Sequence, residues 1–182
     1  MHFFSPVTLS PALLNTPSSI LRQKCAPVRF GEWTTEQLLD IIRELFWLQH
    51  SLKGVGIAAP QVGLGLRLTA IDAGVGPPLA LINPTITVRT PEIERRREAC
   101  LSIPGYYGMI DRPAGVTVEA FDAAGKPFTL QADGLLARVI QHEVDHLDGI
   151  LYPDHLPNLD ALIPMDPDTM ADRAMSDLYA PA

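Results

Sequence analysis

The sequence predicts an α+β fold: short antiparallel strands pack around a central helix, and a further helix lies nearer the N-terminus. Two observations lead to this prediction. Two segments place apolar residues at helical spacing, while the chain between them consists of short β-rich runs separated by Gly, Pro and Asp. Because strands and helices do not alternate regularly, a doubly wound parallel sheet is not expected.

The first helix is predicted over residues 35–52. Thr34 and Gln37 form a capping-box pattern at its start, and Gly54 follows its end. The apolar residues that recur at helical spacing are Leu38, Leu39, Ile41, Ile42, Leu45, Phe46, Leu48 and Leu52. This pattern predicts a helix that buries one side.

Five short runs have the composition of strands: 66–71, 79–82, 86–88, 116–121 and 128–130. The last two are separated by Asp122–Gly125 and therefore predict a hairpin. A second helix is predicted over 134–147, with Asp133 as its cap and Gly149 just past its end.

Composition narrows the class of protein. The chain has 182 residues, of which 47% are hydrophobic and 19% charged, an ordinary balance for one globular domain. Its formal net charge of −7 argues against direct nucleic-acid binding and against binding to anionic membranes.

The two cysteines are too few for a disulfide framework, which favours a reduced, cytoplasmic protein. The N-terminus has no basic segment followed by an apolar run, so no signal peptide is expected. No stretch reaches the roughly 18 apolar residues of a membrane span.

The most informative pattern is a HExxH motif, His142 to His146, on the second predicted helix. Residues four apart lie on one helix face, so both histidines can bind one metal ion. Glu143 points about 100° away around the axis, where it can act on water without binding the metal. Chance occurrence on an amphipathic helix is the alternative, but Leu135 and Val139 extend the same face and favour a buried site.

Two histidines leave a catalytic ion one protein ligand short. No glutamate follows Glu143, and Tyr152 stands where a metzincin would have its third histidine. Cys100 is a candidate, because a thiolate binds zinc or ferrous iron well. A buried cysteine that acts only as a small hydrophobe is the alternative, which we also expect for Cys25, and spacing alone does not decide for Cys100.

Three segments together resemble the signature motifs of the peptide deformylase family, in the order of that family. They are Gly54–Gln61, Glu98–Ser102 and Gln141–His146, with similar flanks at Leu81–Pro84 and Ala132–Leu136. The resemblance spans about residues 20–153. It implies a metal-dependent deformylase-like domain over 1–153, followed by a Pro/Asp-rich C-terminal tail over 154–182.

The resemblance implies a role for each matching residue. Cys100, His142 and His146 would bind the metal, and Glu143 would be the catalytic acid and base. Gln61 and the backbone N–H of Leu101 would stabilise the oxyanion. The residues implied to contact the substrate are Gly56, Ile57, Glu98 and Ala99.

The implied activity is removal of the N-formyl group from N-formylmethionyl peptides or nascent chains, with release of formate. The implied cofactor is Fe²⁺, with Zn²⁺, Ni²⁺ or Co²⁺ as substitutes. Ala99 departs from the family pattern, which has glycine there, and the tail is also unusual. Two alternatives therefore stay open: a relative with altered acyl specificity, and a low-activity protein that binds formyl peptides or inhibitors.

Overall fold

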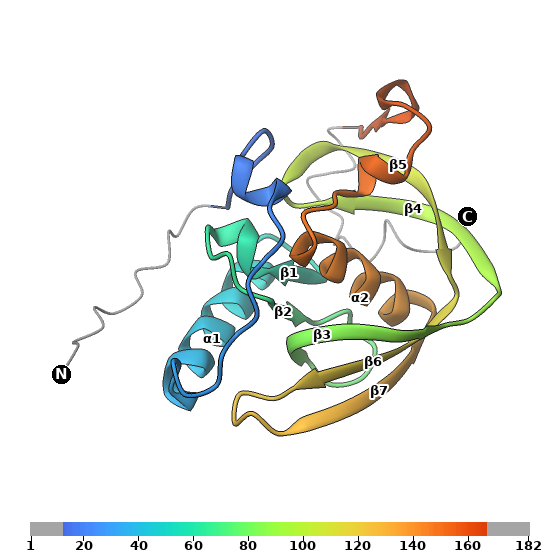
Figure 1. Ribbon diagram of the computed structural model, residues 1–182. Helices are drawn as coiled ribbons and strands as arrows, with labels where there is room; N and C mark the ends of the chain where they lie inside the picture. Colours follow the sequence, from blue (N-terminus) through green and yellow to red (C-terminus); the bar gives the residue numbers. More distant parts are fainter. Residues whose placement is uncertain (1–12, 167–182) are drawn as a thin grey trace.

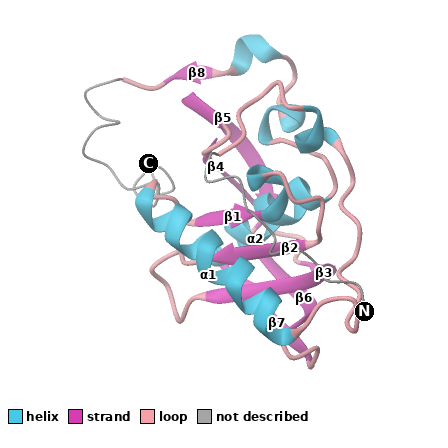
Figure 2. Ribbon diagram, turned by 90° about the vertical axis from the view of Figure 1, so that its left-hand side faces the viewer, coloured by secondary structure: helices cyan, strands magenta, loops and turns pink. Residues whose placement is uncertain are grey.

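The computed structural model describes residues 13–166 and places one helix, α2, between two antiparallel sheets (Figure 1). The predicted α+β fold is therefore confirmed. A second helix, α1, lies against the other face of the larger sheet (Figure 2).

The larger sheet has five strands in the order β1-β2-β3-β6-β7. Its strands are β1 (Gly56–Ala58), β2 (Leu68–Ile71), β3 (Leu79–Arg89), β6 (Gly115–Phe121) and β7 (Pro127–Asp133). All four neighbouring pairs are antiparallel, and β6 and β7 form the predicted hairpin. The short strand β1 is thus one outer edge of this sheet.

The smaller sheet has the order β4-β5-β8. It contains β4 (Ile93–Cys100), β5 (Ile103–Pro113) and β8 (Ile163–Pro164). The pairing of β4 with β5 shifts register between Ala99 and Cys100, so the strand is irregular where the cysteine stands.

Helix α1 (Thr35–Ser51) begins with the predicted capping box: the Thr34 side chain accepts from the Gln37 N–H, and the Gln37 side chain accepts from the Thr34 N–H. Helix α2 (Gly134–Leu147) has the predicted bounds, but Asp133 at its N-cap makes no side-chain capping bond. Four short 3₁₀ helices complete the described elements: η1 (Ser19–Arg22), η2 (Ala59–Val62), η3 (Tyr152–His155) and η4 (Leu159–Ala161).

The core has two main parts, because the larger sheet is covered on both faces. Leu81 packs with Val139 and Ile140 of α2, whereas the next residue, Ile82, packs with Leu38 and other residues of α1. Neighbouring residues of a strand point to opposite faces, so the near-continuous apolar runs of β2 and β3 fit a sheet buried on both sides. The packing of Leu81 with Val139 and Ile140 fixes α2 against one face of the larger sheet.

Three details differ from the prediction. The runs 79–82 and 86–88 are parts of one strand, β3, which continues through Asn83 in a left-handed conformation (φ 52°). Strands β4 and β5 were not predicted, since β4 is rich in Arg and Glu and β5 contains Pro and Gly. Strands β3 and β5, each of 11 residues, are also longer than the short runs expected.

The boundary predicted at residue 153 stays a prediction. Residues 154–166 continue beside the smaller sheet, where Ile163 and Pro164 pair with Tyr107 and Tyr106. The rest of the predicted tail, residues 167–182, lies outside the described residues. Within 13–166, none of the helices has the length and apolar character needed to cross a membrane.

Candidate metal centre

Helix α2 and the end of β4 bring three potential metal ligands together. One donor atom from each of Cys100, His142 and His146 lies within 4.8 Å of the others, and all three side chains are buried. The Cys100 Sγ is 3.2 Å from the His146 Nε2. The two histidines lie one helical turn apart, as their spacing predicted, with ring centroids 4.9 Å apart.

Cys100 stands at the irregular end of β4, within reach of donors from other segments. The Ser102 N–H points to its Sγ at 3.4 Å, and the Gln61 Nε2 lies 3.7 Å from the same sulfur. This environment is the one expected for a ligand. Cys25, in contrast, is a buried cysteine whose pKa is raised to about 11 by burial.

Behind His142, away from the cysteine, lies a buried ion cluster centred on Glu98. The Glu98 carboxylate accepts from His142 Nδ1 at 2.8 Å, from Arg112 Nη2 at 2.5 Å and from Arg138 Nη1 at 3.0 Å. Burial alone would raise the pKa of Glu98, but the His142 hydrogen bond and the charge of Arg112 hold it well below its ordinary value. The cluster fixes the His142 ring so that its Nε2 is the nitrogen left to bind a metal.

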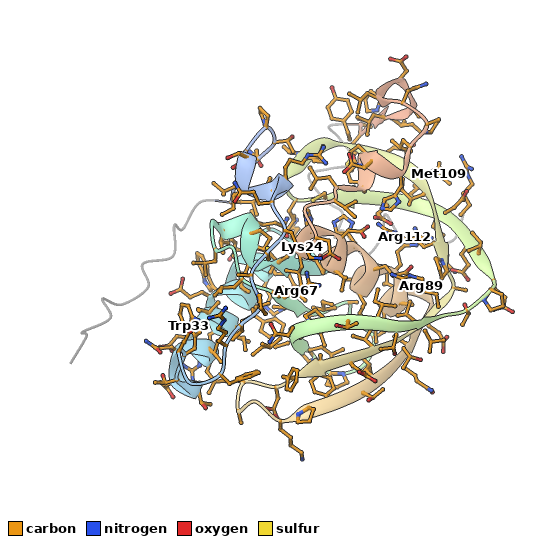
Figure 3. The ribbon with its side chains drawn as sticks, in the orientation of Figure 1. Lys24, Trp33, Arg67, Arg89, Met109 and Arg112 are labelled. Atoms are coloured by element: carbon orange, nitrogen blue, oxygen red, sulfur yellow. The ribbon has the colours of Figure 1, made fainter. Side chains whose placement is uncertain are left out.

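The cluster extends toward the surface through Arg112 of β5, whose side chain reaches Asp145 on α2 (Figure 3). Its Nη1 donates to Asp145 at 2.5 Å, and His155 Nε2 lies 2.8 Å from the same Asp145 oxygen. Asp145 and Glu98 are thus joined by one guanidinium. The metal-binding helix is held by ionic contacts on the side that faces β5.

Glu143, which follows His142 on α2, has a different environment from that of Glu98. It is 3% exposed, and its Oε2 has no hydrogen-bond partner among the described residues. Burial raises the pKa of Glu143 to about 7, while the charge of His142 opposes this rise. A carboxyl group that titrates near neutral pH and has one oxygen without a hydrogen-bond partner is suited to proton transfer.

Gly56 is the neighbour of Glu143 on β1. A Cβ built on Gly56 would lie 2.5 Å from the Glu143 Oε1 and 2.9 Å from the Val139 Cγ1. Only glycine leaves room for the carboxylate here. Gly56 and Ala99 both line the small pocket that contains Cys100, His142 and Glu143.

The remaining predicted residues are placed as follows. Gln61 is 1% exposed; its Oε1 accepts from the Ala58 N–H at 2.8 Å, and its Nε2 donates to the Ser102 Oγ at 3.0 Å. Gln61 and Leu101 line the pocket, but Ile57 and Glu98 do not. Ile57 is fully buried, and its carbonyl accepts from the Thr69 Oγ1 at 2.9 Å, so the geometry favours Gly56 over Ile57 as a contact for a ligand.

The donor set fits a divalent transition metal. One thiolate and two imidazoles provide three ligands, which leaves a position for water or substrate, as in catalytic sites. His142 donates a hydrogen bond from its Nδ1 to the Glu98 carboxylate, an arrangement typical of metal-binding histidines. Soft sulfur and imidazole donors suit zinc, iron, nickel or cobalt rather than magnesium or calcium.

Residues 11–161 match the sequence pattern of the family described as polypeptide deformylase. The chain belongs to this family. A peptide deformylase of Brucella suis is 42% identical over 151 residues, which cover 81% of this chain and 85% of that protein. The family consists of metal-dependent hydrolases, and the Cys–His–His group is therefore best understood as the metal centre of such an enzyme.

Solved structures of the family agree in fold. The peptide deformylase of Thermotoga maritima has a TM-score of 0.75 at 35% identity and covers 79% of this chain and 95% of that one. The enzyme of Synechococcus elongatus, in complex with actinonin, also has a TM-score of 0.75, at 36% identity, covering 98% of this chain and 89% of that one.

Two residues of the site were missed from the sequence. Arg138 is 2% exposed in the middle of α2 and precedes His142 by four residues, so its helical spacing was an available signal. Arg112 stands on a strand that was not predicted, and no local pattern indicated that it pairs with Glu98.

Proposed function

We propose that this enzyme hydrolyses the formyl amide of N-formylmethionyl peptides and nascent chains, and releases formate. Family membership supports the reaction class. The observation that supports it most directly is the placement of Glu143, buried and with one unpaired oxygen, beside three metal-ligating side chains.

We assign the metal to Cys100, His142 and His146, with Fe²⁺ as the proposed native ion and Zn²⁺, Ni²⁺ or Co²⁺ as substitutes. When bound, such an ion lowers the pKa of water and polarises a carbonyl oxygen. Glu98 keeps the His142 ring in the tautomer that presents Nε2, Arg112 helps to keep the pKa of Glu98 low, and Arg138 donates a further hydrogen bond to the same carboxylate.

Glu143 is the proposed proton carrier. It takes a proton from the water that attacks the formyl carbon and later gives a proton to the nitrogen of the leaving amine. The water oxygen forms a new bond to the formyl carbon, and the C–N bond then breaks. Water and formyl peptide are thereby converted to formate and a free N-terminus. A pKa of about 7 allows both transfers near neutral pH.

Gln61 and Leu101 are the proposed donors to the formyl oxygen. The Ala58 N–H holds the Gln61 Oε1, so the Nε2 is directed toward Cys100 and Ser102. The Leu101 backbone N–H lies next to the cysteine ligand and would be the second donor. Each such donor typically contributes about 2.7–4 kcal/mol to transition-state stabilisation.

The substrate backbone is proposed to add to the free edge of β1 at Gly56, opposite Ala99 on β4. We assign this activity to residues 1–153 and no catalytic role to the tail, residues 154–182. The alternative of altered acyl specificity concerns which acyl group is removed. It arises at Ala99, because this residue lines the pocket.

The test is an assay of the free N-terminal amine, with formate or acetate measured as the second product, after anaerobic purification with metal analysis. Formyl-methionyl peptides should be hydrolysed much faster than acetyl-methionyl peptides. Similar rates on both would favour a relative with altered acyl specificity. Tight formyl-peptide binding without turnover in metal-replete protein would favour a binding protein and contradict the proposal.

A further inference from the structure

The two proposed donors to the formyl oxygen stand on segments that are far apart in the sequence. Gln61 lies on η2, which follows β1 of the larger sheet, and Leu101 lies in the turn between β4 and β5 of the smaller sheet. Two donors stabilise an oxyanion only if both lie about 2.7–3.1 Å from the same oxygen. The proposed reaction therefore depends on how η2 and this turn are held relative to each other.

One buried hydrogen bond joins these two segments directly. The Gln61 Nε2 donates to the Ser102 Oγ at 3.0 Å, and both side chains are buried. The Oε1 of the same amide accepts from the Ala58 N–H at 2.8 Å. An amide that is bonded at both ends has a fixed plane, so the second hydrogen of the Nε2 is the one left for the pocket, where the Cys100 Sγ lies 3.7 Å away.

The chain before η1 joins the same two segments through its backbone. The Leu14 N–H donates to the Gln61 carbonyl at 2.8 Å, and the Thr16 N–H donates to the Ser102 carbonyl at 3.1 Å. The two donors are separated by one residue, the spacing at which N–H groups of an extended chain point to the same side. Residues 14–16 thus connect the main chains of the two residues whose side chains also bond to each other.

The chain is anchored on both sides of residues 14–16. Before them, Leu13 packs against the part of the core that contains Ile57. After them, η1 lies against η2 (Figure 1), and its Leu21 is fully buried. The Cys25 N–H then donates to the Leu147 carbonyl at the end of α2, at 2.9 Å. Because these contacts fix the chain, the N–H groups between them can act as a rigid support.

We infer that residues 14–16 position the oxyanion hole: their backbone keeps η2 and the turn after β4 at the separation at which Gln61 and Leu101 can donate to one oxygen. The inference rests on the proposed function and adds positioning residues to it. None of the three residues lines the catalytic pocket, so they act through the residues that they hold rather than by contact with the substrate.

The experiment removes single N–H groups by replacing one backbone amide with an ester. Cys25 makes this possible in the full-length chain, because a synthetic peptide of residues 1–24 can be ligated to a recombinant chain that begins at this cysteine. An ester at Leu14 or at Thr16 removes the N–H that donates to η2 or to the turn, and leaves every side chain unchanged. An ester at Asn15 is the matched control, since its N–H donates to neither carbonyl.

Formate release from a formyl-methionyl peptide is measured at equal metal content. The esters at Leu14 and Thr16 should each lower kcat by up to about 10²-fold, because a small displacement of a positioned group has an effect of this size. KM should change little, since the lost interaction is made in the transition state. The ester at Asn15 should have the kcat of the all-amide enzyme.

A second measurement separates positioning from a general loss of structure. Gln61→Ala, introduced in the recombinant part, removes the donor that the Leu14 N–H holds in place. The ester at Leu14 should therefore change the rate of this variant much less than that of the unchanged enzyme. A segment with only a structural role would lower both rates by the same factor.

The outcomes also separate the inference from the proposed function. Unchanged kcat in both esters, an equal loss in the ester at Asn15, or the same factor in the Gln61→Ala background would overturn the inference while deformylation itself stands. Loss of bound metal together with activity would overturn it too, because the segment would then support the metal centre as a whole. No formate from the unchanged recombinant enzyme would instead refute the proposed function.

Discussion

Two buried glutamates, Glu98 and Glu143, lie near His142, and their hydrogen-bond partners differ. Glu98 is fully buried and accepts hydrogen bonds from one histidine and two arginines. Glu143 is buried to a similar degree but leaves its Oε2 unpartnered within residues 13–166.

The consequence is a difference in protonation. Arginine and histidine partners hold the pKa of Glu98 well below its ordinary value although burial opposes them, whereas burial raises the pKa of Glu143 to about 7. Burial alone therefore does not decide what a carboxyl group does; the number of donors directed at it does. Glu98 therefore keeps its negative charge, whereas Glu143 can exchange a proton near neutral pH.

The largest expected effect is that of removing the free carboxylate. Glu143→Gln keeps the size of the side chain but cannot take a proton, so kcat should fall by about 10²–10⁴-fold. Formate release measures the rate. Metal content, measured on the same sample, should stay at the level of the unchanged enzyme, since Glu143 is not one of the three grouped ligands. Near-normal activity with metal bound would refute the role given to Glu143.

Glu98→Gln tests the role of the carboxylate that is held by hydrogen bonds. It removes the buried negative charge that Arg112 and Arg138 share, although Arg112 keeps Asp145, and this should lower the free energy of unfolding by about 3–5 kcal/mol. Metal affinity, measured by competition with a chelator, should weaken by about 10–100-fold because the His142 ring is no longer fixed.

Glu94→Gln is the matched control for that variant. Glu94 lies on the same strand and pairs with Arg96 at 2.9 Å, but its side chain is 35% exposed. Both measurements should therefore change little. A loss as large as that of Glu98→Gln would mean that the strand, not the buried cluster, is sensitive.

Gly56→Ala crowds the free carboxylate without touching the metal ligands. The new methyl group would lie 2.5 Å from the Glu143 Oε1, so the carboxylate must move, and kcat should fall by up to about 10²-fold. Gly65→Ala, where nothing lies within 4 Å of the added Cβ, should be neutral in the same assay. Equal activity of both variants would show that the position of Glu143 is not critical.

The smallest effect is expected at the exposed end of the cluster. Burial alone would raise the pKa of Asp145, but hydrogen bonds from His155 and Arg112 hold it below its ordinary value. A lowered pKa contributes stability above the unfolded value of about 4, and that contribution is lost as pH falls through the folded value. His155→Gln should therefore lower the free energy of unfolding by less than about 1 kcal/mol at pH 6, and the difference should fade below about pH 4. A difference that grows as pH falls would contradict this account.

The sequence predicted the elements whose signals are local. Helices α1 and α2 were found from spacing and caps, and the β6–β7 hairpin from its turn residues. Strands β4 and β5 were not found, since the Arg95–Arg97 run is polar and Pro104, Gly105 and Gly108 interrupt β5. Their pairing depends on contacts between residues far apart in the chain.

The same distinction applies to the metal centre. His142, Glu143 and His146 follow from one helical turn, whereas Cys100 needed the resemblance to a family before it could be preferred as a ligand. The partners of Glu98 could not be inferred in full, because Arg112 pairs across the smaller sheet and Asp145 meets His155 only after the chain leaves α2. Long-range ion pairs leave no periodic trace in a sequence.

Strand β1 is an outer strand whose open edge lies within the molecule, beside the metal ligands and opposite Ala99. In the proposed binding mode, an edge placed there would admit a single extended chain rather than a folded protein. The proposed activity therefore also depends on when the N-terminus of the substrate is accessible. A polypeptide whose first residues have already folded or docked cannot enter, so deformylation has to be completed in the interval between synthesis of the N-terminus and its burial.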